Sequence, residues 1–154
     1  MEQSILQSGV IPYRRVERQW RVLLVSSRSG RRWVAPKGAI ERGMTPWDSA
    51  AKEALEEAGV RGRVAPQALG DYQYRKLRKL HVVRMFPLLV TEILEEWDED
   101  FRQRLWLPPE EASDKIEEPE LGALILALHQ QLAPPRKLVV PKPKKTVTPK
   151  NSRR

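Results

Sequence analysis

The chain has 154 residues, which is enough for one domain with a hydrophobic core. It contains no cysteine, a composition that excludes disulfides, thiolate nucleophiles and cysteine-ligated zinc and fits a cytoplasmic protein. No apolar run is long enough to span a membrane, and the N-terminus lacks the charged and apolar regions of a secretory signal.

The net charge of +8 resides at the C-terminal end. All 20 acidic residues precede residue 121, whereas residues 134–154 contain eight of the 28 basic residues and no acidic one. We therefore predict a folded domain over residues 1–133 and a disordered, proline- and lysine-rich tail over residues 134–154. The tail either makes weak contact with nucleic acid or another polyanion through its charge, or only keeps the protein in solution.

The N-terminal part of the chain predicts three strands. They cover Ser4–Tyr13, Trp20–Ser26 and Trp33–Pro36, with Gly9 as a candidate bulge and Pro12 near the end of the first strand. The second strand is too apolar for simple alternation, which indicates that it is buried in the middle of a sheet.

A helix is predicted next. Thr45 has the side chain of an N-cap, and Pro46 suits the first helical position because its missing N–H would have no partner there. Gly59 suits the left-handed position that follows a helix. The apolar positions that we expect to pack on a sheet are Ala51, Leu55 and Ala58.

The C-terminal half predicts more strands and then helices. Residues 60–74 predict one or two strands interrupted by Pro66 and Gly70, and residues 81–94 a long strand in which Pro87 indicates an edge or a bulge. Residues 101–107 predict a further strand, residues 108–112 the start of a short helix, and residues 118–132 a helix with an apolar face. This order is typical of an α/β domain with a mixed sheet.

Three glutamates share one face of the first predicted helix. At 100° per residue, Glu56 and Glu57 lie about 60° and 40° to either side of Glu53. Like charges this close repel each other, and a divalent cation would relieve the repulsion. Carboxylate oxygens suit Mg2+ or Mn2+. The alternative interpretation is an acidic helix face that is simply solvated.

The stretch from Gly38 to Val60 resembles the signature of the Nudix hydrolases. That signature is Gly, five residues, Glu, seven residues, then Arg-Glu-aliphatic-x-Glu-Glu-x-Gly-aliphatic. The positions that match in register are Gly38, Glu53, Glu56, Glu57, Gly59 and Val60. The resemblance covers roughly residues 5–132 and implies an α/β/α sandwich that hydrolyses phosphoanhydride bonds. It also implies that the three glutamates bind Mg2+ (or Mn2+), with the Gly38 carbonyl as a further ligand, and that one of them, Glu53 being a candidate, takes a proton from water.

The signature has three departures in this chain. Met44 stands where the family has its first Glu, Lys52 replaces Arg, and Ala54 is small for an aliphatic position. Lysine keeps the positive charge but lacks the planar fork of arginine. Met44 cannot bind a metal or accept a proton, so any role of that first Glu is absent or has moved, with Glu41 as the candidate.

Basic residues flank the acidic helix and suit a phosphate-rich substrate. Residues 21–28, 81–97 and 104–107 are similar to the diphosphoinositol polyphosphate phosphohydrolase branch, which also cleaves diadenosine polyphosphates. We accordingly predict phosphate contacts from Arg28, Arg32, Lys37, His81 and Arg104. Two alternatives stay open: that the basic cluster at residues 75–81 only blocks edge-to-edge aggregation, and that His81 is a structural histidine at the end of a strand. The acidic residues 95–100 are interpreted as a solvated loop, with a late metal ligand as the alternative.

Three functions fit these observations. The first is a Mg2+-dependent hydrolase of diphosphoinositol polyphosphates or diadenosine polyphosphates. The second is a pyrophosphohydrolase that acts on the nucleotide pool or on RNA 5′ ends, which the basic tail would favour. The third is a protein of the same fold that binds or regulates without turnover. The departures at Met44 and Lys52 favour this function, whereas the three intact glutamates argue against it.

Overall fold

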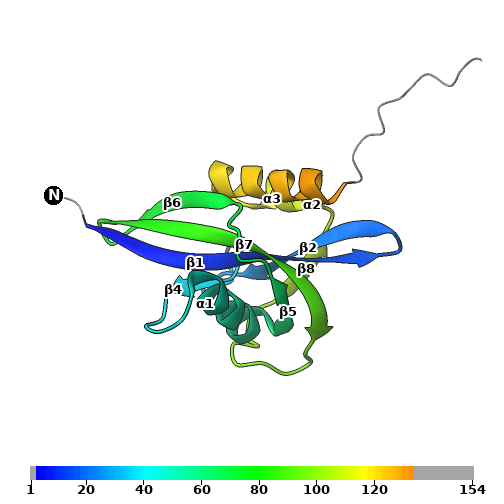
Figure 1. Ribbon diagram of the computed structural model, residues 1–154, viewed down its shortest axis with the longest axis horizontal. Helices are drawn as coiled ribbons and strands as arrows, with labels where there is room; N and C mark the ends of the chain where they lie inside the picture. Colours follow the sequence, from blue (N-terminus) through cyan, green and yellow to red (C-terminus); the bar gives the residue numbers. More distant parts are fainter. Residues whose placement is uncertain (1–2, 134–154) are drawn as a thin grey trace, which may run out of the picture.

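The computed structural model describes residues 3–133, and in this range eight strands form one sheet with helices on both faces (Figure 1). The strands are β1 (Ser4–Val16), β2 (Gln19–Ser26), β3 (Trp33–Val34), β4 (Lys37–Ala39), β5 (Val60–Val64), β6 (Gly70–Lys76), β7 (Lys79–Ile93) and β8 (Arg104–Leu107). The helices are α1 (Pro46–Glu53), continued by the π-helical turn η1 (Ala54–Ala58), α2 (Pro109–Lys115) and α3 (Pro119–Leu132). The predicted basic tail lies outside the described residues.

The sheet is mixed, as the order of elements predicts. Its main path runs β3-β2-β1-β7-β5, while β4 pairs with β1, β6 with β7 and β8 with β2. β1 and β7 pair in parallel along the ten positions from Ser4–Leu80 to Tyr13–Leu89, and the other pairs are antiparallel. The central parallel pair thus joins strands from the two halves of the chain.

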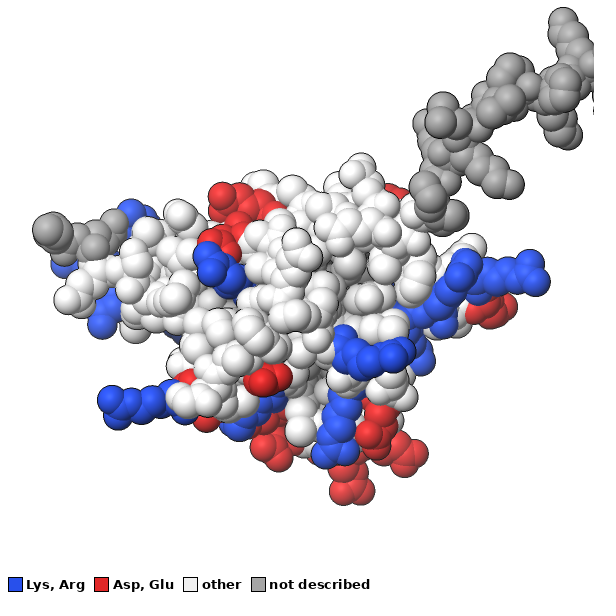
Figure 2. All heavy atoms as spheres, viewed as in Figure 1, with Lys and Arg blue, Asp and Glu red and all other residues white. Residues whose placement is uncertain are grey.

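Two apolar layers enclose the sheet. Val10 and Leu23 face the layer that contains α1, whereas their neighbours Ile11 and Leu24 face the layer that contains α2 and α3. This alternation follows from the two-residue period of a strand. The predicted α/β/α sandwich is therefore confirmed. No helix within residues 3–133 is long and apolar enough to cross a membrane. Figure 2 shows Lys and Arg side chains projecting around the margin of one face, whose centre is largely uncharged.

Gly9 does not form the predicted bulge. β1 keeps a regular register through this residue, which pairs with Met85 on one side and with Lys37 on the other. A Cβ atom at Gly9 would lie 2.5 Å from the Pro36 oxygen and 2.9 Å from the Lys37 Cβ. The glycine is needed because Pro36 and Lys37, which lead into β4, lie very close to β1 at this point.

The two prolines in strands also differ from prediction. β1 continues past Pro12 to Val16 and turns directly into β2. Pro87 lies in β7, an interior strand, rather than at an edge or a bulge. On the side of β7 that faces away from β1, the neighbouring strand changes from β6 to β5 near this residue. β6 pairs with β7 up to Met85 and β5 pairs from Leu88, so the missing N–H of Pro87 falls in the gap between them.

We expect Gly9→Ala to lower the free energy of unfolding by about 1–3 kcal/mol, because the added methyl group overpacks the contact with Pro36. Chemical denaturation followed by circular dichroism measures the change. An unchanged midpoint and slope would contradict the role assigned to this close approach.

Candidate active site

The segment between β4 and β5 places the glutamates. The Thr45 hydroxyl accepts a hydrogen bond from the Asp48 N–H at 3.1 Å, and Pro46 is at the first helical turn, as predicted. Gly59 ends the helical segment with a φ of 66°, which confirms its predicted left-handed conformation. The sequence therefore predicts both ends of this helical segment correctly.

The end of the helix is wider than an ideal α-helix. Residues Ala54–Ala58 form a π-helical turn, in which the Gly59 N–H points to the carbonyls of Ala54 and Leu55. A π-turn rotates less per residue than the 100° assumed in the prediction. Consequently Ala50, Ala54 and Ala58 are the fully buried row against the sheet, and the prediction was wrong for Ala51 and Leu55, which are half-buried. The small side chain of Ala54 fits this close packing.

Glu53 and Glu57 lie together beneath β4. The Lys37 N–H points to Oε1 of Glu57 at 3.4 Å. A Cβ atom at Gly38 would lie only 2.5 and 2.6 Å from the two carboxyl oxygens of Glu53. β4 can therefore approach the glutamates only because residue 38 has no side chain.

Burial perturbs both of these carboxyl groups. Burial is the main cause that raises the pKa of Glu57 to about 8; Glu53 and Glu99 act in the same direction, and Arg102 opposes them. Burial likewise raises the pKa of Glu53, against a hydrogen bond with Glu57. Two such groups side by side retain a proton near neutral pH unless a cation is supplied. Two neighbouring, half-buried carboxyl groups whose charge is only partly compensated by Arg102 fit a hard divalent cation.

The carboxylate of Glu56 is engaged by a lysine. Its Oε2 atom forms a short ion pair with Lys52 Nζ, which also lies 2.7 Å from Oε2 of Glu41. Within residues 3–133 no three acidic or histidine side chains are gathered as a ready-made metal site, so the structure brings together only two of the three predicted glutamates. Glu41 supplies Lys52 with a carboxylate that Met44 cannot provide.

Two adjoining cavities open beside Glu57. The first, of about 300 Å³, has five basic residues and one acidic residue, Glu57, among the described residues that line it. The second, of about 400 Å³, shares Arg32, Lys37 and Lys76 with the first and adds Tyr74, Arg75 and Glu118. We call the two cavities together the basic groove. Its basic residues are Arg28, Arg32, Lys37, Arg75, Lys76 and Arg102.

The residues predicted to contact phosphate divide into two groups. Arg28, Arg32 and Lys37 line the basic groove. His81 is 9% exposed, its ring is stacked on that of Tyr74 at 4.6 Å, and it is absent from the described lining of both cavities. The position of His81 matches the structural alternative.

Arg104 also lies apart from the groove. Its Nη1 atom donates to the carbonyls of Leu94 at 2.9 Å and Ala58 at 3.2 Å, and its guanidinium lies 4.0 Å from the ring centre of Trp97. The indole N–H of Trp97 in turn donates to the Glu57 carbonyl at 3.0 Å. Arg104 thus braces the end of the helix that carries the glutamates.

Sequence analysis missed Arg102 and undervalued Glu99. Arg102 is 8% exposed, lines the first cavity, and donates to Oε1 of Glu99 at 2.8 Å and to the Ser26 carbonyl at 2.9 Å. The Glu99 N–H donates to the Glu56 carbonyl at 3.0 Å, so this residue is packed on the site rather than in a solvated loop. A run of acidic residues carries no local signal that marks Glu99 among its neighbours.

Comparison with known proteins gives a consistent result. A family model described as the NUDIX domain matches residues 6–128. Diphosphoinositol polyphosphate phosphohydrolase 3-beta of Bos taurus is 41% identical over 102 residues, which are 64% of this chain and 61% of that protein. Nudix hydrolase 17, mitochondrial, of Arabidopsis thaliana is 34% identical over 150 residues, 91% of this chain and 81% of that protein.

A solved structure has the same fold. The crystal structure of C. elegans Ap4A hydrolase matches with a TM-score of 0.68 and 20% sequence identity, covering 85% of this chain and 100% of that one. The present chain spans about three fifths of the length of the bovine relative.

The stability of the metal-free protein should decrease as the pH rises from about 4.5 to 8. An unfolded glutamate loses its proton near 4.5, whereas folded Glu57 keeps it to about 8, so the folded state binds more protons in this interval. Thermal unfolding in the presence of a chelator measures this slope. Glu57→Gln should flatten it, and a slope that is equal in the variant would contradict the assigned pKa.

Proposed function

The chain belongs to the Nudix hydrolase family, and on that premise we propose that it is a hydrolase of phosphoanhydride bonds that depends on Mg2+ or Mn2+. The observation that carries the proposal is the position of Glu57 in the wall of a cavity whose other charged residues are basic. A carboxylate site for a cation next to a basic surface suits a substrate with several phosphates.

We propose that Glu53 and Glu57 hold the metal ion and that the Gly38 carbonyl completes this side of the site. Glu56 joins them when its side chain leaves Lys52, which keeps its second partner, Glu41. When bound, a divalent ion would neutralise charge on phosphate oxygens and lower the pKa of an attacking water. One of the glutamates, with Glu53 as the candidate, would accept the proton of that water.

The basic residues of the groove bind and orient the phosphates. Arg28 is mostly exposed, at 75%, and stands at the mouth of the first cavity, whereas Arg102 is buried in its wall. Arg102 also favours the ionised form of Glu57, because its charge opposes the rise in the pKa of that carboxyl. This graded arrangement suits a phosphate chain that enters from solvent and ends beside the glutamates.

The substrates that we propose are diphosphoinositol polyphosphates or diadenosine polyphosphates. The number of basic residues along the groove favours the most highly phosphorylated members of these classes. The activities for which the bovine relative and the C. elegans protein are named support the same two classes for this chain.

The direct test measures phosphate and nucleotide release with Mg2+ over a panel. It contains a diphosphoinositol polyphosphate, diadenosine penta- and hexaphosphate, ADP-ribose, an oxidised dGTP and a 5′-triphosphate RNA. We expect turnover of the highly phosphorylated members and a loss of about 10²-fold or more in Glu57→Gln. Glu95→Gln, in the exposed part of the acidic loop, is the matched control and should retain activity.

Two other outcomes of the panel would change the proposed function. Turnover of only ADP-ribose, dGTP or RNA would keep hydrolase activity and reject the substrate class. Binding of a panel member without any turnover would favour a regulatory protein of this fold.

Glu41→Gln should lower kcat/KM by roughly 10–100-fold, because Lys52 would then pair with Glu56 alone and hold it away from the metal. Glu92→Gln, which removes an exposed ion pair with Arg61 outside the groove, is the control and should have little effect. Equal activities of the two variants would contradict the role proposed for Glu41.

A further inference from the structure

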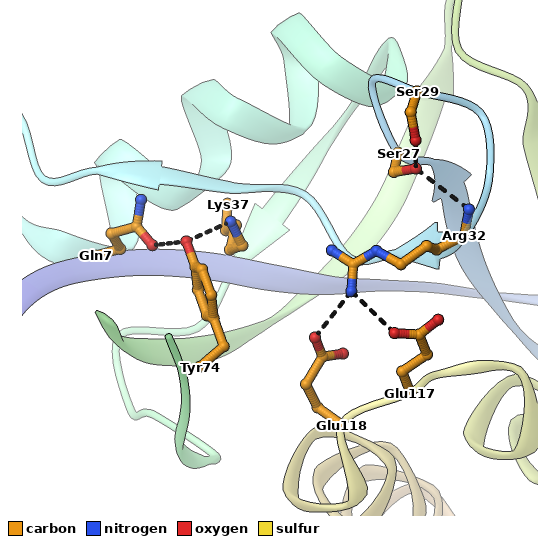
Figure 3. A network of polar contacts seen from close by, with 8 residues as sticks. All are labelled: Gln7, Ser27, Ser29, Arg32, Lys37, Tyr74, Glu117 and Glu118. Carbon is orange, nitrogen blue, oxygen red and sulfur yellow. Dashed lines mark hydrogen bonds and ion pairs between the residues drawn. The ribbon is translucent and has the colours of Figure 1, made fainter. Parts of the chain in front are cut away.

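Arg32 lies where the two cavities of the basic groove meet, and two carboxylates hold it (Figure 3). Its Nη1 atom is 3.2 Å from Oε1 of Glu117 and 3.4 Å from Oε2 of Glu118. Glu117 is largely exposed, whereas Glu118 is 20% exposed and itself lines the second cavity. A negative charge therefore stands inside a groove that is otherwise suited to phosphates.

The backbone of Arg32 is fixed, so only its side chain is able to change partners. The Ser27 N–H donates to the Arg32 carbonyl at 2.8 Å, and the Ser27 hydroxyl accepts from the Arg32 N–H at 3.2 Å. Ser29 lies against the same hydroxyl at 3.3 Å. Glu118 occupies the N-cap position of α3, and its carbonyl accepts from the Gly122 N–H at 3.1 Å, so its backbone is also anchored.

The side chain of Lys37, unlike that of Arg32, is held by neutral groups. Its Nζ atom donates to the Tyr74 hydroxyl at 2.9 Å, and that hydroxyl donates to Oε1 of Gln7 at 2.8 Å (Figure 3). These partners are neutral, so they orient the lysine and leave its charge uncompensated. Arg32 with its two glutamates instead forms a cluster with a net charge of −1.

We propose that Glu117 and Glu118 are specificity-determining residues that compete with substrate phosphates for Arg32. The inference rests on the proposed function, since it concerns which phosphate-bearing substrates the groove accepts. A phosphate that reaches only Lys37 meets a full positive charge. A phosphate that needs Arg32 must displace two carboxylates that carry the same charge as itself.

The two glutamates therefore weaken the binding of long or densely phosphorylated ligands more than that of short ones. Glu117 lies closer to Arg32, whereas Glu118 is less exposed and borders the second cavity directly.

The test uses inorganic tripolyphosphate as the probe and isothermal titration calorimetry on the full chain, with a chelator and no added metal. We expect Glu117→Gln/Glu118→Gln to bind tripolyphosphate roughly tenfold more tightly than the unmodified protein. The matched control is Glu110→Gln/Glu111→Gln, which removes the same charge from exposed positions of α2 outside the groove and should change the affinity by about twofold or less.

A double-mutant cycle with Arg32→Gln separates competition for Arg32 from simple repulsion. If the glutamates compete for Arg32, the gain in affinity from the two glutamate substitutions is larger when Arg32 is present than in the Arg32→Gln background. An equal gain in both backgrounds, no gain, or weaker binding would overturn the proposal. Glu118→Gln alone provides the same comparison if the double variant is too unstable to titrate.

This comparison is independent of catalysis. The readout is binding without metal or turnover, so its failure would leave phosphoanhydride hydrolysis standing. Conversely, a protein without hydrolytic activity would still reveal whether the glutamates weaken tripolyphosphate binding.

Discussion

The partial burial of two neighbouring carboxyl groups, Glu53 and Glu57, determines the chemistry of the site. Burial raises the pKa of both, so the pair retains a proton unless positive charge is brought to it. β4 covers the pair closely because Gly38 has no side chain. β4 can pair with β1 at this position because Gly9 leaves room for Pro36 and Lys37. Two glycines far apart in the sequence therefore serve one purpose, the enclosure of the glutamates.

Charge around this pair is divided between two sides of the helix. On one side, Lys52 forms ion pairs with both Glu41 and Glu56 and so holds Glu56 apart from the other two glutamates. On the other side, the basic groove holds an excess of positive charge, but some of its basic residues are already paired with glutamates and are not free to bind phosphate. Arg102 is engaged by Glu99, whereas Lys37 has neutral partners. We infer that these charged side chains exchange partners when substrate and metal bind, while the backbone stays in place.

Much of the fold could be predicted because it depends on local signals. The cap at Thr45, the left-handed Gly59 and the apolar strands act through neighbouring residues, and they were predicted correctly. The π-turn at Ala54–Ala58 was missed, because it reflects packing of three alanines against the sheet and not the propensity of its residues.

The site was only partly predictable. The spacing of the glutamates located it, but Arg102 is brought to it by a turn far along the chain. His81 and Arg104 were assigned to phosphate on likeness to a family, and their positions depend on contacts with Tyr74 and Trp97 that sequence spacing does not reveal. Charge alone does not show whether a basic residue faces a groove or braces a helix.

Proton release on metal binding reveals whether the Glu53–Glu57 pair holds a proton that a metal ion displaces. Calorimetric titration of Mn2+ into the metal-free protein, in two buffers with different ionisation enthalpies, gives the number of protons released per ion. With the pKa of Glu57 at about 8, we expect about one proton to be released per metal ion at pH 7 and clearly fewer at pH 9. Binding that releases no proton at pH 7, or no binding at all, would contradict this expectation.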